Sequence, residues 1–299
     1  MMIEQLLLAE FGEKKVKWKV PLKEHLSFRV GGDCKAMIFP ETVEEIKGAI
    51  ALCNQEKVKY FILGKGTNLI ASDEGYDGVV IKLSGGFEKL VIQGNLFTAQ
   101  AGASLSALAK KALENGLTGL EFAAGIPGTL GGAVMMNAGA YDGEIKDVIS
   151  EVTFLDEYGE IRTYTKEQCD FSYRNSVFQE QQGIILSAQL ILKEGNAESI
   201  REKMEDFARR RSAKQPLTYP SAGSTFKRPE GYFAGKLIQD AGLMGLTVGG
   251  AMISDLHAGF IINKGNATAK DILDLIELVR HTVNDKFGVM LEPEVKLLK

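Results

Sequence analysis

The stretch AAGIPGTLGGAVMMNAGAY, residues 123–141, constrains the fold more than any other part of the sequence. Glycine and alanine fill many of its positions, so its backbone has little side-chain bulk to keep neighbouring groups at a distance. Such a backbone can pack closely between a helix and a strand, or it can lie against a flat or extended ligand. Thr129 and Asn137 add polar groups that suit the second arrangement.

A second glycine-rich turn, LGKGTNLI at residues 63–70, overlaps the end of the apolar run VKYFILG, which predicts a strand over 58–64. Glycines at this place let backbone N–H groups approach a phosphate, and Thr67 and Asn68 add side-chain donors. The spacing is neither that of a Walker loop nor that of a Rossmann fingerprint. An ordinary strand-to-loop turn explains this motif alone equally well. Two such loops in one half of the chain favour a bound dinucleotide.

Helix and hairpin signals alternate in the first two thirds of the chain. They predict a helix from Thr42, with Glu45 completing a capping box, a hairpin over 88–101 that turns at Gly94-Asn95, a helix from Ser104 to Gly116, and a hairpin over 152–165 that turns at Asp156–Gly159. Antiparallel hairpins mixed with helices are typical of an α+β fold rather than of repeated βαβ units.

Charge density rises after residue 195, where we place a domain boundary. The signals beyond it predict a helix from Ala197 that Pro216 ends, a helix over 268–288 with Ile272, Leu275, Ile276, Val279 and Val283 on one face, and a strand-like segment over 289–298. The 299-residue length agrees with two or three domains.

Composition excludes several classes of protein. A net charge of −4 argues against a dedicated nucleic-acid binder, and no stretch is long and apolar enough to span a membrane. The N-terminus lacks the basic start and apolar run of a signal peptide. Three widely spaced cysteines form no disulfide framework, and three scattered histidines form no local metal site. We therefore expect a cytoplasmic protein without a metal.

Arginine 174 lies in FSYRNSVF, residues 171–178, between two phenylalanines and next to Tyr173. An arginine on such an apolar platform is commonly held for an anion. An interdomain salt bridge explains the motif about equally well.

The stretch YPSAGSTFKRPEG, residues 219–231, offers the hydroxyls of Ser221, Ser224 and Thr225, which serve either a turn or a reaction. In LEPEVKLL, residues 291–298, two carboxylates would share one side of an extended strand, although a surface strand end is the more ordinary interpretation. We interpret His257 as a structural or loop histidine rather than a catalytic base.

Six motifs occur in one order over nearly the whole chain, namely FRVGG, LGKGTNLI, GIPGTLGGAVMMNAGAY, SYRNSVF, AGSTFKRP and LEPEV. This ordered set resembles the UDP-N-acetylenolpyruvoylglucosamine reductases, flavoenzymes that act on the way to UDP-N-acetylmuramic acid. The resemblance implies an FAD-binding region of the vanillyl-alcohol-oxidase (PCMH) type made of two α+β subdomains, and a C-terminal α+β substrate-binding domain. The implied division is an N-terminal segment 1–28, an FAD-binding domain 29–195 and a substrate domain 196–299.

The resemblance also implies non-covalent FAD, with NADPH as the reductant. Its motifs place the cofactor contacts on Arg29, Gly64, Lys65, Gly66, Thr67, Asn68, Leu69, Gly125, Pro127, Gly128, Thr129, Gly132, Asn137 and Gly139.

Three catalytic roles follow from the same resemblance. N5 of the reduced flavin delivers hydride to the terminal carbon of the enolpyruvyl group, and the electrons move into the carboxylate. Arg174 binds and stabilises that carboxylate, for which its planar fork is suited. Ser224 donates the proton, and Glu294 assists at the enolate. Because a hydroxyl is a weak acid, we expect a cation such as Lys227 to stabilise the alkoxide.

The substrate contacts implied are Tyr173, Arg211, Lys227 and Arg228, with the cations at the UDP diphosphate. Many family members have asparagine at the position of Arg228. The chain resembles the shorter type, because it has no room for an inserted, tyrosine-bearing segment before Ala197. No protein partner is inferred.

Two other functions fit parts of the sequence. A flavin oxidase of the same cofactor fold would share the glycine loops, but the second half shows no histidine or cysteine pattern for covalent flavin. A non-catalytic nucleotide-sugar-binding module would keep the loops and cations and would not need Ser224.

Overall fold

The computed structural model describes residues 2–299, which form two compact units. Unit 1 comprises the chain up to Lys17, Ala36–Lys65 and Gly78–Arg210, and unit 2 comprises Trp18–Lys35, Gly66–Asp77 and Arg211–Lys299. The chain therefore enters unit 2 twice before its C-terminal part.

The helices are α1 Met2–Lys15, α2 Val43–Gln55, α3 Leu105–Glu114, α4 Leu130–Met135, α5 Ala197–Lys214, α6 Ala234–Asp240 and α7 Ala269–Phe287. The strands are β1 Val16–Pro21, β2 Asp33–Ile38, β3 Lys59–Leu63, β4 Leu69–Ala71, β5 Tyr76–Lys82, β6 Leu90–Gln93, β7 Leu96–Gln100, β8 Leu117–Thr118, β9 Gly139–Ala140, β10 Gly143–Glu144, β11 Ile149–Asp156, β12 Ile161–Thr165, β13 Gly183–Ile191, β14 Lys193–Glu194, β15 Thr247–Val248, β16 Ala251–Ile253, β17 Ile261–Asn263 and β18 Lys296–Leu298.

A four-stranded sheet in the order β1-β2-β5-β3 contains the first glycine-rich turn at the end of β3. Helix α2 packs against β3 and α1. Its N-cap is confirmed, because the Thr42 hydroxyl accepts the N–H of Glu45 at 3.1 Å. The predicted capping box is wrong in one bond, since the Glu45 carboxylate accepts the N–H of Glu41 at 2.7 Å and not that of Thr42.

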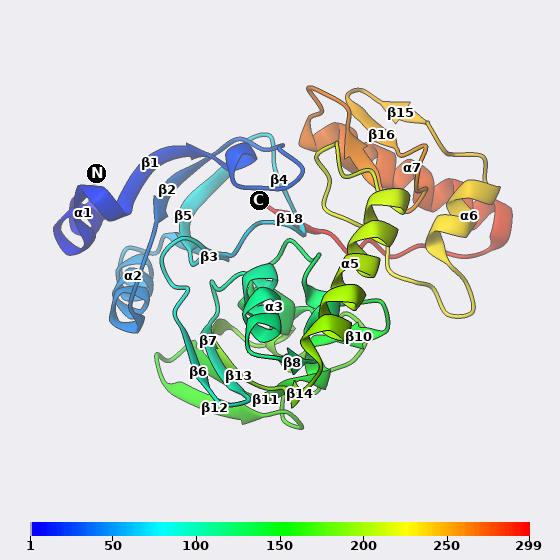
Figure 1. Ribbon diagram of the computed structural model, residues 1–299. Coiled ribbons are helices and arrows are strands. Elements are labelled where there is room, and N and C mark those ends of the chain that lie inside the picture. The colour runs from blue at the N-terminus through cyan, green and yellow to red at the C-terminus, as the bar shows by residue number, and fades with distance from the viewer. Residues whose placement is uncertain (1) are drawn as a thin grey trace. The chain divides into compact units, whose positions relative to one another are not determined.

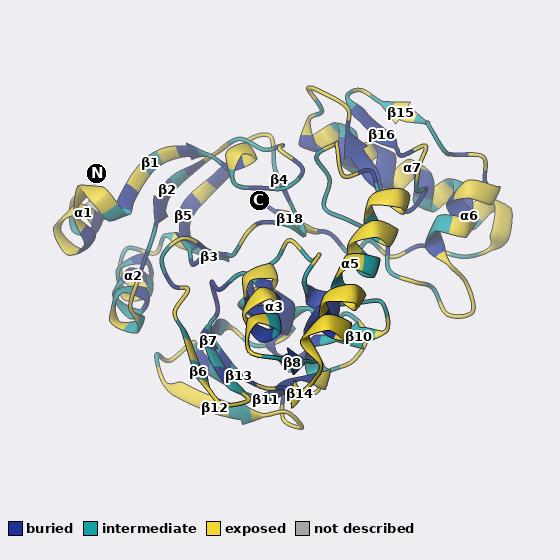
Figure 2. Cartoon of the chain, viewed as in Figure 1, coloured by how far each residue is buried: buried dark blue, intermediate teal, exposed yellow. Residues whose placement is uncertain are grey.

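A five-stranded sheet lies within unit 1, has the order β12-β11-β13-β7-β6 and is antiparallel throughout (Figure 1). Both predicted hairpins form in it, as β6–β7 and β11–β12. Strand β12 lies at an edge and is mostly exposed, whereas β11 and β13 are largely buried (Figure 2). Helix α4, inside the glycine-rich stretch, packs on β13 and β7.

Unit 2 is built around α7, whose predicted apolar face is confirmed. Ile272, Leu275, Ile276, Val279 and Val283 are all buried in one core that also contains residues of α6, β16 and β17. The sheet β15-β16-β17 is antiparallel, and β18 pairs with β4 in parallel. Gly288 ends α7 in the left-handed conformation, which glycine adopts without strain.

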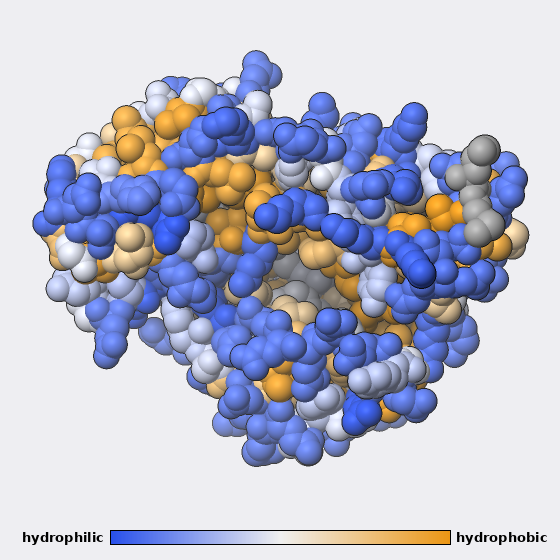
Figure 3. All heavy atoms as spheres, turned by 180° about the vertical axis from the view of Figure 1, so that it is seen from behind, coloured by the Kyte–Doolittle hydropathy of each residue, from blue (hydrophilic) through white to orange (hydrophobic). Residues whose placement is uncertain are grey.

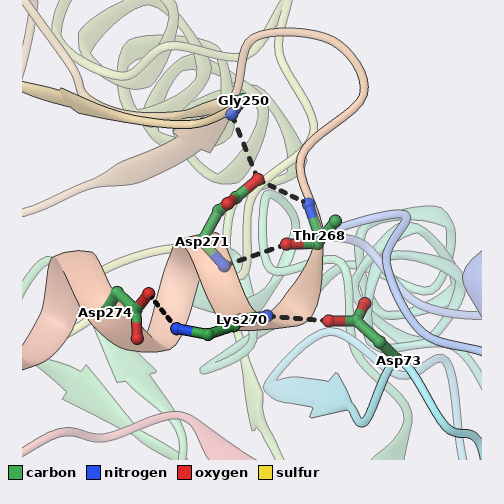
Figure 4. A network of polar contacts seen from close by, with 6 residues as sticks. All are labelled: Asp73, Gly250, Thr268, Lys270, Asp271 and Asp274. Carbon is green, nitrogen blue, oxygen red and sulfur yellow. Dashed lines mark hydrogen bonds and ion pairs between the residues drawn. The ribbon is translucent and has the colours of Figure 1, made fainter.

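The first turn of α7 is held by two carboxylates from different parts of unit 2 (Figure 4). Asp73, from the loop after β4, accepts the N–H groups of Ala269 at 2.8 Å and Lys270 at 2.9 Å. Asp271 accepts the N–H of Thr268 at 2.9 Å and that of Gly250 at 3.1 Å. The bonds from Thr268, Ala269 and Lys270 satisfy donors that a helix leaves unpaired at its start, and the bond from Gly250 joins α7 to the residue before β16.

The predicted start of α3 is confirmed, because Ser104 stands at its N-cap position, although its side chain makes no capping bond. Two other expectations from the sequence are corrected. The strand-like segment 289–298 is a strand only over Lys296–Leu298. Helix α5 does not begin a new packing unit at residue 195, because unit 1 extends to Arg210. The division by function into 1–28, 29–195 and 196–299 stays a prediction.

Candidate active site

The two glycine-rich loops of unit 1 lie in contact. A Cβ atom on Gly64 would stand 2.5 Å from the Thr129 Oγ1 atom, so the first loop can approach the second only as glycine. Lys65 donates its Nζ to the Ser104 hydroxyl at 2.8 Å, and Ser104 forms an isolated bridge with Thr129. The N–H of Leu105 donates to the carbonyl of Gly128 at 3.1 Å. Predicted cofactor residues from two motifs therefore form one surface.

Adjacent glycines at the start of α4 have different surroundings. A Cβ on Gly131 would stand 2.8 Å from the Cβ of Ala101, so this glycine is required by helix–strand packing. A Cβ on Gly132 would meet only Thr129 Oγ1, at 3.5 Å. Gly132 is exposed, as are Gly125 and Pro127. The stretch 123–141 thus has one side that packs against the protein and one side that is open to a ligand. Both arrangements considered from the sequence are therefore possible in it.

The open side fits FAD. It presents backbone without side-chain bulk at Gly125 and Gly132, and the exposed Lys65 ammonium lies beside the same surface. Backbone without side chains allows a diphosphate to approach closely, and a cation beside it suits the negative charge. The residues present therefore agree with the cofactor that the sequence implies.

Asn137, which the resemblance places among the flavin contacts, is fully buried. Its amide nitrogen donates to the Glu144 carboxylate at 3.2 Å and to the carbonyl of Ser172 at 2.9 Å. Its amide oxygen accepts the N–H of Lys146 at 3.1 Å. The amide thus ties the segment after α4 to the loop that carries Arg174, and the predicted contact of Asn137 with the cofactor stays a prediction.

Arg174 lies in that loop with a left-handed backbone, at φ 56°. Its Nη2 donates to the carbonyl of Gly139 at 3.3 Å, and its guanidinium lies over the ring of Tyr173, 5.1 Å from the centroid. Gln179 donates to the main-chain carbonyl of Arg174 at 2.9 Å. Arg174 is half-buried and Tyr173 is exposed, so the platform predicted from the sequence is present beside the second glycine loop.

The remaining predicted cofactor residues belong to unit 2. Gly66 is buried at φ 63°, and a Cβ there would stand 2.4 Å from the carbonyl oxygen of His25. Its own carbonyl accepts the N–H of Ser27 at 3.0 Å. Arg29 is exposed and has a left-handed backbone, with φ at 55°. Thr67 lies half-buried in the turn before β4.

Asn68 and Leu69 join this turn to the C-terminal residues. The Asn68 amide donates to the carbonyl of Glu294 at 3.2 Å, and its main-chain carbonyl accepts the N–H of Lys296 at 3.0 Å. Leu69 then begins the parallel pairing of β4 with β18. The predicted cofactor turn and the segment that carries Glu294 are therefore parts of one structure.

Ser224 and Glu294 are both connected to Thr225, the first as its neighbour in the chain and the second by a hydrogen bond. The N–H of Glu294 donates to the carbonyl of Thr225 at 2.8 Å, and Ser224 forms an isolated bridge with Phe260. Ser224 is exposed, and its hydroxyl donates to the carbonyl of Phe226 at 3.3 Å, whereas Thr225 is fully buried. The structure thus brings together two of the three predicted catalytic residues within unit 2.

The predicted substrate cations each have a protein contact. Lys227 pairs with the carboxylate of Glu292 at 2.5 Å, and Arg211 Nε donates to the Gln215 amide at 2.9 Å. The guanidinium of Arg228 lies 4.0 Å from the ring centroid of Phe233. These contacts orient the three cations.

The expectation that Lys227 stabilises a Ser224 alkoxide is corrected. Bridges at Ser224 and Phe226 show that this segment is extended, and side chains three residues apart in an extended segment point to opposite faces. The ammonium of Lys227 is bound instead to the carboxylate of Glu292.

His257 lies close to this junction. Its Nδ1 accepts the N–H of Gly259 at 3.1 Å, and its ring meets Phe260 edge-on at a centroid distance of 4.9 Å. Burial lowers the pKa of His257, and the nearby charge of Lys214 lowers it further. A neutral ring bonded to the backbone agrees with the structural role expected for it.

Sequence reasoning missed three contributors to these surfaces. Ser104 binds Lys65, and Thr225 joins the segments of the two catalytic candidates. Tyr141 stacks on Phe207 at 4.3 Å and donates its hydroxyl to the Phe207 carbonyl at 3.0 Å. The Tyr141 contact links the second glycine loop to α5. No local pattern marks such pairs, because their members are distant in sequence.

Family models match two separate parts of the chain. An FAD binding domain matches residues 34–165, and the C-terminal domain of UDP-N-acetylenolpyruvoylglucosamine reductase matches residues 215–298. A UDP-N-acetylenolpyruvoylglucosamine reductase from Caldanaerobacter subterraneus is 52% identical over 286 residues, which cover 96% of this chain and 94% of the relative. The chain belongs to the UDP-N-acetylenolpyruvoylglucosamine reductase family. The resemblance seen in six motifs is confirmed.

Solved structures agree with this family. The UDP-N-acetylenolpyruvylglucosamine reductase of Thermus caldophilus matches with a TM-score of 0.81 and 36% identity, over 95% of this chain and 98% of that one. p-Cresol methylhydroxylase matches with a TM-score of 0.50 and 15% identity, over 65% of this chain and 43% of that one. The second likeness concerns the fold alone, and it confirms the PCMH-type architecture expected for the FAD-binding region.

Two further properties of the chain bear on its class. Within residues 2–299, no helix combines the length and apolarity of a membrane span. The face shown in Figure 3 is largely hydrophilic, with apolar residues in patches between hydrophilic ones. The three cysteines, all among the described residues, are buried and not in disulfides, and burial raises the pKa of Cys34 and Cys53 to about 11 and that of Cys169 to about 12.

Proposed function

We propose that this chain reduces UDP-N-acetyl-3-O-(1-carboxyvinyl)-glucosamine to UDP-N-acetylmuramate in peptidoglycan precursor synthesis, with non-covalent FAD as cofactor and NADPH as reductant. The observation that carries the proposal is the junction in unit 2, where an exposed serine hydroxyl and Glu294 flank one buried threonine. A nucleotide-sugar-binding module would not require a hydroxyl held in that way. When bound, FAD supplies the redox chemistry, taking hydride from NADPH and passing it to the terminal carbon of the enolpyruvyl group.

Arg174 binds the substrate carboxylate, where negative charge grows as the hydride arrives. A guanidinium that is already oriented lowers the barrier because it does not reorganise during the reaction. The contacts to Gly139 and Tyr173 support that role, since they orient the guanidinium. The loop that holds it is fixed through the buried Asn137.

Ser224 gives the proton to the carbon next to the carboxylate. The exposed hydroxyl is directed by its bond to the Phe226 carbonyl, and a strongly basic enolate carbon is an acceptor that even a weak acid can protonate. Glu294 assists at the enolate from the neighbouring segment. Arg211, Lys227 and Arg228 remain the proposed contacts of the UDP diphosphate, and Tyr173 remains a proposed substrate contact. Cysteines without disulfides support a cytoplasmic location.

The first test is spectroscopic. The purified protein should be yellow, NADPH should bleach it without air, and the enolpyruvyl sugar should restore the colour. A colourless protein that releases no flavin on denaturation would overturn the proposal. A protein that NADPH bleaches, but that oxygen alone reoxidises, would instead be a flavin oxidase.

The second test separates the hydroxyls of one loop. Ser224→Ala should leave bleaching by NADPH unchanged and slow reoxidation by the substrate about 10²- to 10⁴-fold, the usual contribution of a positioned acid. Ser221→Ala, a half-buried serine three residues away, is the matched control and should behave as the wild type. Equal turnover in both variants would remove Ser224 from the mechanism.

A further inference from the structure

Thr225 occupies an unusual place in unit 2, because it is a fully buried polar residue between an exposed serine and the segment of Glu294. We propose that Thr225 is a positioning residue whose side chain and main chain fix Ser224 and Glu294 relative to each other. This inference rests on the proposed function and adds to it the group that determines where the proton donor stands.

Three segments that are distant in sequence meet at Thr225. Its N–H donates to the carbonyl of Gly259 at 2.9 Å, and its hydroxyl accepts the N–H of Ile261 at 3.2 Å. On its other side its carbonyl accepts the N–H of Glu294 at 2.8 Å. One residue therefore bonds to both neighbouring segments through three polar groups.

The loop that carries Ser224 runs antiparallel to the segment 259–263 and is bonded to it at both ends. At one end the N–H of Asn263 donates to the carbonyl of Pro220 at 2.9 Å, and at the other Thr225 makes its two bonds. Between these ends Gly223 turns the chain at φ 79°. Without the Thr225 hydroxyl, the Ser224 end of the loop would keep only main-chain bonds.

The side chain at 225 has to be a small hydroxyl. The N–H of Ile261 is buried, and Oγ1 of Thr225 is the acceptor that it meets. A buried donor that loses its acceptor must find another or move. Because Ile261 begins β17, which pairs with β16, movement of the loop is less constrained than movement of the strand. Loss of the hydroxyl should therefore displace Ser224.

The hydroxyls of Thr225 and Ser224 lie on opposite faces of this extended segment. Thr225 faces inward and is fully buried, whereas Ser224 faces outward. A shift of Thr225 moves both Ser224 and the bonded main chain of Glu294. Displacements of about 1 Å at a reacting group can cost about 100-fold in rate.

The experiment compares three variants of the FAD-loaded protein. Thr225→Val keeps the shape and removes the acceptor, Thr225→Ser keeps the acceptor, and Thr268→Val removes the N-cap hydroxyl of α7 elsewhere in unit 2. Measured well below each unfolding temperature, Thr225→Val should bind FAD and bleach with NADPH normally but be reoxidised by the substrate about 10- to 100-fold more slowly. Thr225→Ser should stay within about threefold of the wild type, as should Thr268→Val.

The stereochemistry of the product is the readout that a purely structural role would not move. A displaced Ser224 lets solvent protonate the enolate from either face, so Thr225→Val should give both epimers at the new centre. If Thr225→Val does not fold, Thr225→Ala, which leaves room for a water on Ile261, takes its place with the same expectation.

Two outcomes are distinguishable. A single epimer at wild-type rate from Thr225→Val or Thr225→Ala would overturn the positioning role while leaving the proposed function intact. No turnover of the enolpyruvyl sugar by the wild-type protein would instead overturn the proposed function itself.

Discussion

The two units present their candidate surfaces in different ways. In unit 1 the surface around Gly64, Thr129 and Gly132 comes from glycine-rich loops whose composition is visible in the sequence. In unit 2 the surface around Ser224 comes from separate segments that meet through main-chain bonds at Thr225. A surface formed by glycine-rich backbone depends on the absence of side chains. A surface formed where separate segments meet depends on the hydrogen bonds that join those segments.

This difference predicts how each surface fails. Substitutions in the glycine loops should act by adding atoms, and they should be judged by what a new Cβ would touch. Substitutions at the junction should act by removing a bond, and they should be judged by which partner loses its contact. Substitutions in both units can test this contrast. The first concerns Arg174, because it adds a charged side chain to the surface that the glycine loops form in unit 1.

Arg174→Ala should have the largest effect. It removes the cation proposed at the substrate carboxylate, so reoxidation of the reduced protein by substrate should slow about 10²- to 10³-fold. Flavin content and bleaching by NADPH should not change. Rapid mixing of reduced protein with substrate measures this step. Arg174→Lys keeps the charge but loses the fork, and it should fall between alanine and the wild type. A threefold loss or less in the alanine variant would contradict the assignment.

Gly131→Ala and Gly132→Ala form a pair of neighbours with opposite expected defects. At Gly131 the new Cβ meets Ala101 at 2.8 Å, so the free energy of unfolding should fall by about 1–3 kcal/mol. At Gly132 the nearest protein atom is 3.5 Å away, and alanine favours a helix by up to about 1 kcal/mol. Thermal unfolding of the flavin-free proteins measures both effects.

Only Gly132→Ala should weaken the flavin site without weakening the fold. FAD titration should show an affinity lower by about tenfold, which corresponds to about 1.4 kcal/mol of overlap. Unchanged FAD affinity in a stable Gly132→Ala protein would show that the cofactor does not approach α4 there.

The smallest effect is expected at the start of α7, where the carboxylate of Asp271 accepts hydrogen bonds from the N–H groups of Thr268 and Gly250. Asp271→Asn should lower the free energy of unfolding by about 1 kcal/mol. Asp274→Asn removes only an exposed ion pair with Lys270 and should cost less than about 0.5 kcal/mol. Chemical unfolding at pH 7 should separate the two, and equal losses would contradict the capping role.

The same carboxylate predicts a dependence on pH. Hydrogen bonds from the main chain of Thr268 and Gly250 hold the pKa of Asp271 below its ordinary value of 3.8. Its contribution to stability is therefore present above pH 3.8 and is lost as the pH falls through the lower pKa of the folded protein. The difference in stability between wild type and Asp271→Asn should shrink on acidification.

Local structure followed closely from the sequence wherever its cause was local. The N-cap at Thr42, both hairpins and the apolar face of α7 were predicted because capping, turn chemistry and helical periodicity act within a few residues. At Ser104 the predicted helix start is also confirmed, but the use of its hydroxyl was not predicted. Lys65, which is distant in sequence, donates to that hydroxyl.

The candidate site shows the same limit. Composition identified both glycine loops, and the ordered motifs identified Arg174, Ser224 and Glu294. Composition did not show that Gly131 and Gly132 have different surroundings. A side chain on Gly131 would touch Ala101, whereas Gly132 has space for one. The resemblance placed Asn137 at the cofactor, and only the structure shows that its amide is hydrogen-bonded inside the protein. Whether a polar side chain faces a ligand or its own chain depends on neighbours that the sequence does not list.

By itself the sequence determined the family, the α+β class and the residue types available for the reaction, because ordered motifs, periodicity and turn chemistry are local properties. Only the tertiary structure decided the use of the hydroxyls in YPSAGSTFKRPEG. Burial and bonds to Gly259, Ile261 and Glu294 hold Thr225 inside, and alternation along the extended segment leaves Ser224 exposed. Those partners are distant in the chain, and folding brings them to the same residue.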